Sequence, residues 1–596
     1  MLKGETLVEV FNQQVEKLGD RVALKRRNGD LWESITWREY GKAVKEVGLG
    51  FVSMGFEPGE IVSVFSNNRP EWHFADLGCM AMGGVTVPIY QTSAEDQIEY
   101  ILGHAETRYI VVQDDDFLQK ILKVKDQLPK LEKAVLIDGT SDDDFVMTLD
   151  ELREVGREYA EKNQTAYEER CKGVKGDGLA TLVYTSGTTG RPKGAEITHH
   201  NIVWTVDSIS QVISSDENDR ILSYLPLSHI LERLSSNFNQ IYIGFQTWFA
   251  ESVDTLVRDL GDCRPTIFVA VPRVWEKAYG RIKEGLEEST GLQHTLAMKA
   301  LDLGKKRVAL EQEGKALGAW DSIVHGLLGK IVFGKIQNQL GLDAARICVS
   351  GAAPLAAEIM EFFSAIGLPI CEGYGQTEDT GPTSLNPPEK IKIGTVGPAL
   401  PGVTVKIADD GEILVKGDNV FRGYYKNPEA TAETLQDGWL YSGDVGELDD
   451  DGYITITDRK KDLIITAGGK NIAPQELEGR IKFGQLVSQA VVIGDRRKYL
   501  TALVTLDPEA LEKWAGEKGK KFDMEALCQD DDVRAEVQKA IDETNAHFSR
   551  TESIKKFEIL PRDFTIDDGE MTPSLKVRRR TIVDKYADTI ESMYAE

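Results

Sequence analysis

The sequence predicts an α/β protein with a large N-terminal domain of helix-covered β-sheets, a β-rich subdomain and a small C-terminal α/β domain. Three observations support this fold class. Short apolar runs alternate with amphipathic helical patterns through the first three-quarters of the 596 residues, which is typical of parallel sheets covered by helices. Residues 402–416 and 453–458 instead read as short strands joined by turns. After Asp462 a shorter α/β pattern follows.

The elements of the N-terminal part are read from these alternating runs. Apolar runs of four to six residues predict buried strands, and segments with a 3.6-residue apolar period between them predict helices. Strands are predicted at Ile61–Phe65, Tyr109–Val112, Thr266–Val271 and Ile347–Ser350, and helices near 71–83, 93–104 and 355–366.

The C-terminal quarter contains two kinds of element. The β-rich subdomain has predicted turns at Asp410-Gly411 and Asp451-Gly452, because Asp-Gly pairs are typical turn dipeptides. Beyond it the pattern predicts a compact α/β segment, with a helix starting near Pro474, strands at 490–493 and 502–506, and a helix across 532–548.

Length and composition limit the class of protein. A chain of 596 residues exceeds the size at which one core stops growing, so at least two domains are expected. No apolar run is long enough to span a membrane, and residues 1–20 carry early charges where a signal peptide has an apolar core. The six cysteines include no C-x-x-C pair, which favours neither a zinc site nor a disulfide framework. We therefore expect a cytoplasmic protein. The formal net charge of −27 argues against general binding to nucleic acid or to anionic lipid.

Residues 281–340 are predicted to be helical and carry no chemical motif. Their second half contains an apolar set with two interspersed lysines, Lys330 and Lys335. Most such stripes are buried, so a core or interdomain helix is the preferred interpretation. A membrane-surface helix is the alternative, and it would make the protein peripheral to the membrane. The apolar set comprises Ile323, Val324, Leu327, Leu328, Ile331, Val332 and Phe333.

The most informative stretch is Thr185-Ser-Gly-Thr-Thr-Gly-Arg-Pro-Lys-Gly194, which follows the apolar run Leu179–Tyr184. A buried strand that opens into a loop of Gly, Ser and Thr predicts a phosphate-binding turn. Glycines let the backbone approach an anion, hydroxyl and backbone N–H groups donate hydrogen bonds, and Lys193 adds a compact positive charge. The loop is not a Walker A motif, because no Gly-Lys pair in the chain is followed by Ser or Thr.

This loop resembles the signature of the adenylate-forming acyl-CoA synthetases, a superfamily shared with luciferases and peptide-synthetase adenylation domains. Further segments match that family in the expected order along nearly the whole chain, and together they are far more specific than one Gly-rich loop. They are Leu225-Pro-Leu-Ser-His229, Ser350-Gly-Ala-Ala-Pro354, Gly373-Tyr-Gly-Gln-Thr-Glu378, Tyr441-Ser-Gly-Asp444, Asp458-Arg-Lys-Lys-Asp462 and Met571-Thr-Pro-Ser-Leu-Lys576.

The resemblance implies two domains and an ATP site. Residues 1–460 would bind ATP and the acyl group, and residues 461–596 would form a mobile domain that carries the catalytic lysine. Thr185 and Glu378 would approach Mg²⁺, a hard cation that takes few protein oxygens beside phosphate oxygens. The loop residues implied to hold the phosphates are Thr185, Ser186, Gly187, Thr188, Thr189, Gly190 and Lys193.

Other residues are assigned to the nucleotide by the same resemblance. Tyr374 would stack on adenine, and Thr377 would contact the α-phosphate. Asp444 would accept from the ribose hydroxyls, and Arg459 would donate to the same sugar. The small residues Gly351, Ala352 and Ala353 would let the backbone lie against the base.

The catalytic and CoA-handling residues also follow from the family. Lys576 would bridge the carboxylate and the α-phosphate, although Leu575 stands where the family commonly has glycine. His229 would line the substrate site without acting as a general base, because a carboxylate needs no deprotonation at neutral pH. Lys461 occupies the hinge position, and Gly468-Gly469 would face the CoA channel.

Basic residues cluster at Arg459–Lys461 and at Lys576–Arg580. Both clusters fall in motif segments, and ATP and CoA are polyanions, so we expect them to serve the substrates. Arg578, Arg579 and Arg580 are interpreted as a solvated basic face. The pair Glu232-Arg233 stands where some long-chain enzymes have a gating tryptophan, so no such gate is inferred.

The implied function is that of an AMP-forming long-chain fatty acid–CoA ligase, which uses fatty acid, ATP, Mg²⁺ and CoA. A fatty acyl-AMP ligase that loads a carrier protein is the nearest alternative. Its restraining insertion has no room here, because Gly394–Gly397 follows Glu378 so closely. A peptide-synthetase domain, a luciferase-like oxygenase and a non-catalytic acyl-nucleotide sensor are further alternatives. The sequence leaves monomer and homodimer open.

Overall fold

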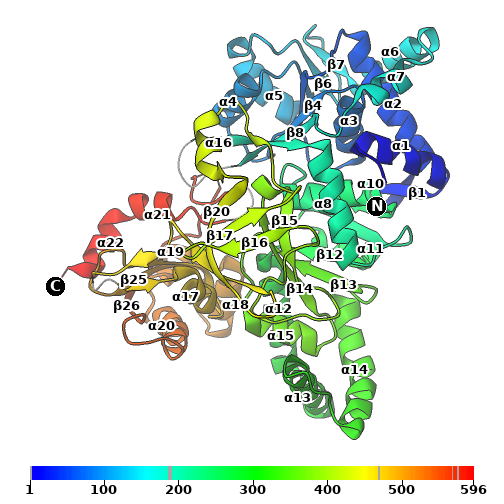
Figure 1. Ribbon diagram of the computed structural model, residues 1–596. Helices are drawn as coiled ribbons and strands as arrows, with labels where there is room; N and C mark the ends of the chain where they lie inside the picture. The colour runs from blue at the N-terminus through cyan, green and yellow to red at the C-terminus, as the bar shows by residue number, and fades with distance from the viewer. Residues whose placement is uncertain (1–2, 186–190, 468–469, 567, 573–575, 596) are drawn as a thin grey trace. The chain divides into compact units, whose positions relative to one another are not determined.

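The computed structural model describes residues 3–185, 191–467, 470–566, 568–572 and 576–595 (Figure 1). The chain divides into two compact units. The first comprises Met1–Val405, Leu414–Tyr441 and Asp449–Ile454, and the second comprises Lys406–Ile413, Ser442–Leu448 and Thr455–Glu596. The proposed boundary at 460/461 stays a prediction, since the second unit also takes in two short segments before it.

The first unit is built on an eight-stranded sheet in the order β18-β9-β8-β4-β3-β5-β6-β7. Its strands from β8 to β7 pair in parallel, whereas β9 is antiparallel to both β8 and β18. The strands are β3 (Ile61–Phe65), β4 (Val85–Pro88), β5 (Tyr109–Val112), β6 (Lys133–Leu136), β7 (Val146–Thr148), β8 (Leu179–Thr185), β9 (Lys193–Thr198) and β18 (Gly423–Tyr424).

Helices cover both faces of this sheet, because its central strands are apolar on both sides. In β3, Val62 and Val64 join a core with α2 and α3, while Ile61 and Phe65 join a second core with α4 and α5. The alternation follows from the two-residue period of a strand. Figure 1 shows these helices around the sheet. They are α2 (Trp37–Ser53), α3 (Pro70–Ala81), α4 (Glu95–Ala105) and α5 (Asp115–Val124).

Two four-stranded sheets complete the strands of the first unit outside the β-rich part. One has the order β10-β11-β1-β2 and the other β12-β13-β14-β15. In the second, β12, β13 and β14 run parallel and β15 is antiparallel. The strands are β1 (Val22–Asn28), β2 (Leu31–Thr36), β10 (Arg220–Ser223), β11 (Gln246–Phe249), β12 (Ile267–Ala270), β13 (Ile347–Ser350), β14 (Ile370–Gln376) and β15 (Gly381–Leu385).

Several helices of the first unit, among them α2, α6 and α8, begin at a side-chain cap. Thr36 and Thr148 each form a capping box with a glutamate three residues later, and Thr198 does so with Asn201. Further helices of this unit are α1 (Leu7–Leu18), α6 (Leu149–Lys162), α7 (Ala166–Gly173), α8 (His199–Val212), α9 (Ile230–Glu232), α10 (Asn239–Ile243), α11 (Leu256–Cys263), α15 (Ala357–Ala365) and α16 (Pro428–Thr434).

The β-rich subdomain is a five-stranded sheet in the order β16-β17-β20-β19, with β21 beside β20. The predicted turns are present, and Gly411 and Gly452 adopt the positive φ values of 84° and 82° that favour glycine. The strands are β16 (Thr404–Ile407), β17 (Glu412–Lys416), β19 (Leu435–Gln436), β20 (Trp439–Leu448) and β21 (Ile454–Arg459).

The C-terminal α/β segment has its own core around a three-stranded sheet, β24-β25-β26. Beside it stand the short pair β22-β23 and six helices described from Pro474 onward. The elements are β22 (Ile464–Ile465), β23 (Asn471–Ile472), β24 (Val487–Ile493), β25 (Leu500–Leu506), β26 (Ile554–Ile559), α17 (Pro474–Ile481), α18 (Pro508–Glu517), α19 (Met524–Leu527), α20 (Asp531–Asn545), α21 (Arg579–Lys585) and α22 (Ala587–Tyr594).

Residues 281–340 are helical as predicted, but the preferred interpretation of their apolar stripe is wrong. They form the end of α12 (Pro272–Glu288), then α13 (Gly291–Gln312) and α14 (Ala319–Gln339). Of the apolar residues in α14, only Phe333 is buried. The others spread around the helix, since a run this dense has members on every face.

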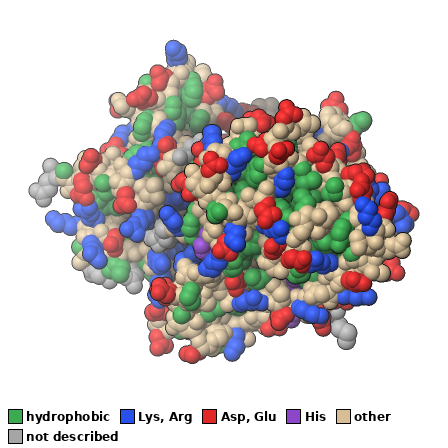
Figure 2. Space-filling view, turned by 90° about the horizontal axis from the view of Figure 1, so that it is seen from above, with side chains coloured by type: hydrophobic (Ala, Val, Ile, Leu, Met, Phe, Trp, Pro, Cys, Tyr) green, Lys and Arg blue, Asp and Glu red, His purple; other side chains and the backbone are tan. Residues whose placement is uncertain are grey.

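Among the described residues no helix is both long and apolar enough to cross a membrane. On the face shown in Figure 2, acidic and basic side chains lie interspersed, with apolar side chains between them.

Candidate active site

The predicted phosphate loop joins two antiparallel strands of the large sheet. Thr185 ends β8 and pairs with Lys193 at the start of β9, so both flanks of the loop are held by the sheet ladder. The strand before the loop is buried through Tyr184, whose hydroxyl lies 2.7 Å from Nδ1 of His104. The predicted residues Ser186, Gly187, Thr188, Thr189 and Gly190 lie outside the described residues.

Tyr424 connects two of the predicted site residues. Its hydroxyl donates to Oε1 of Glu378 at 2.6 Å, and Nζ of Lys193 lies 4.8 Å from the centre of its ring. Tyr424 reaches this place because β18 pairs with β9, with Tyr424 opposite Ala195. Burial and the Glu378 carboxylate raise the pKa of Tyr424 far above its usual value, so the phenol keeps the proton that it donates. Sequence reasoning missed this residue.

Glu378 has the chemistry of a ligand for a hard cation. Its backbone is fixed because its carbonyl accepts from Phe421 N at 2.8 Å. Oε1 is oriented by Tyr424, and among the described residues Oε2 has no hydrogen-bond donor. The half-buried carboxylate of Glu378 and the hydroxyl of Thr185 at the end of β8 are oxygen donors of the kind that suits Mg²⁺ together with phosphate oxygens. The described residues contain no cluster of three or more His, Cys, Asp or Glu side chains that would hold a metal without a phosphate.

The predicted adenine-binding segments lie at the carboxyl ends of two neighbouring parallel strands. Ser350, the last residue of β13, pairs with Glu372 of β14, so residues 351–353 leave the sheet where residues 373–376 form the last part of β14. Ligands of α/β proteins bind at such an edge. Ala352 has φ = 70°, a left-handed conformation that is unusual for a residue other than glycine. A strained backbone of this kind at a strand end is consistent with a functional constraint.

Two buried polar atoms at this edge are unsatisfied. Oγ of Ser350 and Nε2 of Gln376 have no hydrogen-bond partner among the described residues. Such atoms are costly to bury unless a ligand or water satisfies them. Gln376 caps the short 3₁₀ helix Thr377–Asp379, which buries Thr377 beside them. Tyr374 stands half-buried in β14 opposite Ser384.

Glu372 is a buried carboxyl group behind the same edge. Its Oε1 accepts from Leu355 N at 2.8 Å, and only 4% of the residue is exposed. Burial raises the pKa of Glu372 to about 8. The side chain is therefore mostly protonated at neutral pH, and it holds the loop after β13 without adding negative charge to this edge of the sheet.

His229 forms the N-cap of α9, and its Nδ1 accepts from Leu231 N at 3.2 Å. An accepting Nδ1 leaves the proton of the neutral ring on Nε2, so the ring can donate but not accept there. This agrees with the prediction that His229 lines the substrate site without acting as a general base. The pair Glu232-Arg233 in the same segment is buried. Arg233 donates hydrogen bonds to Asp76 and to Thr181 Oγ1, the latter at 2.5 Å. The pair therefore anchors the segment to the core.

In the second unit, the two predicted ribose-binding residues lie together. Nε of Arg459 is 3.4 Å from Oδ1 of Asp444, which is 6% exposed. Gly443 has φ = 75°, and its N–H donates to Glu412 Oε1 at 2.9 Å. This turn places a buried carboxylate beside a guanidinium, a pair suited to vicinal hydroxyls.

The predicted hinge residue Lys461 lies in a turn that Asp462 N closes on Arg459 O at 2.9 Å. Its neighbour Lys460 fixes the turn, with Nζ 2.6 Å from Asp410 and 2.7 Å from Glu412. Sequence reasoning assigned the hinge to Lys461 and gave Lys460 no role of its own. Gly468 and Gly469 lie outside the described residues.

Thr572 and Lys576 are joined by two hydrogen bonds. The N–H of Lys576 donates to Thr572 Oγ1 at 3.0 Å, and the carbonyl of Lys576 accepts from Thr572 N at 2.8 Å. The interpretation of the next arginines as a solvated face is wrong for Arg579. That side chain is 19% exposed, bonds to Glu478 at 2.5 Å and donates to Val492 O.

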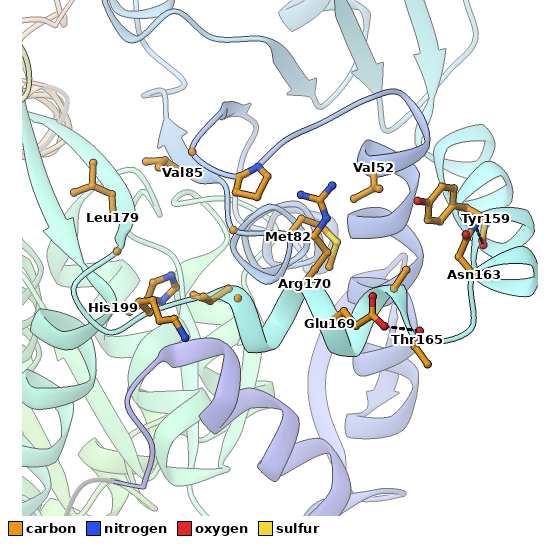
Figure 3. A pocket seen from close by; sticks show the side chains of 18 of the residues that line it. Val52, Met82, Val85, Tyr159, Asn163, Thr165, Glu169, Arg170, Leu179 and His199 are labelled. Atoms are coloured by element: carbon orange, nitrogen blue, oxygen red, sulfur yellow. Dashed lines mark hydrogen bonds between the residues drawn. The ribbon is translucent and has the colours of Figure 1, made fainter.

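A separate cavity of about 1070 Å³ lies near α2, α6 and α7 (Figure 3). Its lining includes none of the predicted site residues. Arg170 is paired there with Glu57 at 3.2 Å, and burial lowers the pKa of His199 to about 4, which keeps its ring neutral. The cavity is therefore separate from the predicted nucleotide site.

Comparison with known families divides the chain in two. Residues 11–425 match the family of AMP-binding enzymes. Residues 461–596 match the C-terminal domain of AMP-binding enzymes.

Relatives of similar length share a substantial fraction of the sequence. A protein of Mycobacterium bovis named long-chain-fatty-acid–CoA ligase FadD15 is 37% identical over 582 residues, which cover 96% of this chain and 94% of the relative. The human long-chain-fatty-acid–CoA ligase ACSBG2 is 32% identical, over 99% of this chain and 92% of its own length.

Solved structures share the fold. The adenylation domain of the carboxylate reductase of Mycobacterium chelonae superimposes with a TM-score of 0.77 at 22% identity, covering 100% of this chain and 92% of that one. The anthranilate CoA ligase AuaEII in complex with anthranoyl-AMP gives a TM-score of 0.72 at 20% identity, covering 98% of both chains. The predicted α/β fold, with a large N-terminal and a smaller C-terminal domain, is confirmed.

Proposed function

The chain belongs to the AMP-binding enzyme family, and we propose that it is a long-chain fatty acid–CoA ligase that forms AMP. One observation carries the proposal: relatives named for this activity align with almost the whole chain, through both matched regions. The alternatives raised by the sequence have no comparable support.

The reaction has two steps. The fatty acid carboxylate attacks the α-phosphorus of ATP, the bond to the β-phosphate breaks, and diphosphate leaves. The thiol of CoA then attacks the acyl carbonyl, and AMP leaves with the former carboxylate oxygen. Both reactants of the first step are anions, so catalysis rests on positioning and on neutralising charge.

We assign the phosphates of ATP to the loop between β8 and β9. Lys193 stands at its end, where its charge would meet the phosphates, and Tyr424 holds Lys193 and Glu378 at one place. The adenine is assigned to the edge of β13 and β14, with Tyr374 stacking and residues 351–353 giving backbone contact. The unsatisfied Nε2 of Gln376 supports this, because it offers a donor to the base.

Mg²⁺ is proposed to bind at Glu378 and Thr185 together with the phosphates, where it would neutralise negative charge. Replacing Glu378 by Gln keeps an acceptor for Tyr424 but removes the charge. We expect this variant to need about tenfold more Mg²⁺ for half-maximal adenylation. An unchanged Mg²⁺ titration would refute this assignment and leave the ligase proposal standing.

The second unit is proposed to act on the same substrates in turn. Asp444 and Arg459 would hold the ribose, and Lys576 would neutralise the charge that builds up between carboxylate and α-phosphate. Thr377 would contact the α-phosphate and His229 would line the junction. Rotation at Lys461 would then bring Gly468-Gly469 to the CoA channel.

A preference for long chains is expected because each buried methylene contributes about 0.8 kcal/mol in an apolar tunnel. The test measures AMP, diphosphate and acyl-CoA from purified protein with acids from acetate to very long chains, with and without CoA. We expect turnover with long chains only when CoA is present. Accumulation of acyl-AMP that does not react with CoA would favour an acyl-AMP ligase. Light emission with a luciferin would favour a luciferase. Absence of diphosphate with every acid would favour a non-catalytic sensor.

A further inference from the structure

Helix α14 presents a row of large apolar side chains to solvent. Trp320, Ile323, Leu327 and Ile331 are 75%, 57%, 62% and 67% exposed. Their spacing of three, four and four residues places them on one face of the helix. We call these four residues the apolar stripe. Large apolar side chains that share a face are rarely left in water without a partner.

The apolar stripe faces solvent because the opposite side of the helix pair α13–α14 packs at α15. Gly304 of α13 lies against α15, where an added Cβ would be 2.4 Å from the carbonyl oxygen of Ala365. Gln337 near the end of α14 donates to Ile366 O at 2.8 Å, and Phe333 is buried on this inner side. Figure 1 shows α13 and α14 running together away from the strands of this unit.

Two lysines of α14 border the apolar stripe. Lys330 lies three residues after Leu327, and Lys335 lies four residues after Ile331. The two lysines therefore flank the apolar stripe on opposite sides. Among the described residues neither lysine forms an ion pair, and the single carboxylate of α14, Asp321, is paired with Lys306 at 2.7 Å. In a chain with a net charge of −27, this is a local cationic border around an apolar surface.

We propose that the apolar stripe docks α14 on the surface of an anionic lipid bilayer. Apolar side chains would enter the boundary between headgroups and acyl chains, and long lysine side chains would reach the anionic headgroups. Tryptophan at one end of the stripe suits this interface. A second copy of the chain would bring the same cationic border against itself, whereas anionic lipid supplies the opposite charge.

The docking surface lies on elements without any proposed catalytic residue. It is therefore separable from the ligase activity, which can be assayed with a water-soluble medium-chain acid. Docking would place the enzyme on the phase in which long-chain acids dissolve.

The experiment sediments the full-length protein with vesicles of phosphatidylcholine alone or mixed with phosphatidylglycerol, without ATP or CoA. The stripe variant replaces Trp320, Ile323, Leu327 and Ile331 by Ser. A matched control replaces Leu31, Val253 and Val257 by Ser, which are 73%, 65% and 54% exposed on other elements. A third variant carries Lys330→Gln and Lys335→Gln. Circular dichroism and thermal melting establish that each variant folds.

We expect the wild type and the control to bind vesicles with phosphatidylglycerol. The stripe variant should bind at least about tenfold less, and the lysine variant about fivefold less per lysine. The wild type should bind phosphatidylcholine more weakly. Equal binding by wild type and stripe variant, an equal loss in the control, or no binding by the wild type would overturn the proposal.

Sedimentation velocity without vesicles tests the competing occupant. A wild-type dimer that the stripe substitutions dissociate would assign the stripe to a second copy and overturn the lipid proposal. AMP formation from decanoate, measured without vesicles, should be equal in all four proteins. Its absence in the wild type would count against the ligase proposal while the vesicle result still decides the docking surface.

Discussion

The hydroxyl of Tyr424 donates a hydrogen bond of 2.6 Å to Glu378, while the ammonium group of Lys193 lies over the same ring. Glu378 follows β14, Lys193 begins β9 and Tyr424 lies on β18, so one side chain joins residues from three distant segments. The proposed magnesium ligand and the proposed phosphate lysine are thereby held at one place before substrate binds. Preorganisation of this kind lowers the cost of binding a polyanion.

Replacing Tyr424 by Phe should impair nucleotide use. The variant keeps the ring beside Lys193 but loses the donor to Glu378, a charge-assisted hydrogen bond. We expect the apparent KM for MgATP to rise about tenfold with little change in stability. Steady-state kinetics measures this, and Tyr425→Phe is the control, since no hydrogen bond joins Tyr425 to Glu378. Equal KM values in the two variants would remove Tyr424 from the site.

Replacing Asp444 by Ala should weaken ATP binding. The buried carboxylate is the proposed acceptor for two ribose hydroxyls, and its loss leaves Arg459 without its neighbour. We expect the KM for ATP to rise at least about tenfold, while the dependence on fatty acid stays the same. Asp450→Ala, which changes an exposed carboxylate in the turn between β20 and β21, is the control. A raised KM for the acid instead would show that Asp444 serves another substrate.

Glu372 should make stability fall as pH rises. Its folded pKa is about 8, against 4.5 for the ordinary side chain. Between these values the folded protein holds a proton that the unfolded chain releases, so the contribution present below pH 4.5 is lost as pH rises through 8. The free energy of unfolding, measured by denaturant titration from pH 5.5 to 8.5, should fall less steeply in Glu372→Gln. Parallel curves for variant and wild type would place the pKa near its ordinary value.

Lys576 and Lys461 should separate the two half-reactions. Lys576→Ala should lose adenylation by about 10³-fold yet still convert supplied acyl-AMP and CoA to acyl-CoA. Lys461→Pro should form acyl-AMP and stall, because the ring fixes φ in the turn that must rotate. Lys461→Ala, which does not restrict φ, should retain both steps. Loss of both steps in each folded variant would contradict the alternating use of the second unit.

Much of the fold could be predicted because strands in parallel sheets are apolar throughout. Tyr109–Val112 and Ile347–Ser350 form strands with the bounds that were predicted, and the helix near Pro474 begins at that residue. The pairing of Ser350 with Glu372, which brings two motif segments together, could not be read from local patterns. It depends on strand order, a tertiary property.

The failures have a common physical cause. The apolar set at residues 323–333 of α14 was expected to be buried, and Arg579 was expected to be solvated. Both expectations used composition, whereas burial depends on neighbouring elements. Arg579 is half-buried because Glu478, 101 residues earlier, faces it. Tyr424 was missed because a tyrosine beside a glycine gives no local sign of a partner on another strand.

The central claim is that an acyl-adenylate lies between the fatty acid and acyl-CoA. It is tested most directly with a long-chain acid labelled with ¹⁸O in both carboxylate oxygens, in the presence of ATP, Mg²⁺ and CoA. Attack on the α-phosphorus, followed by attack of the thiol on the carbonyl, leaves one labelled oxygen on the phosphate of AMP. We predict one ¹⁸O atom in each AMP formed, measured by mass spectrometry. Acyl-CoA formed with unlabelled AMP, or with the label in diphosphate or inorganic phosphate, would contradict the account.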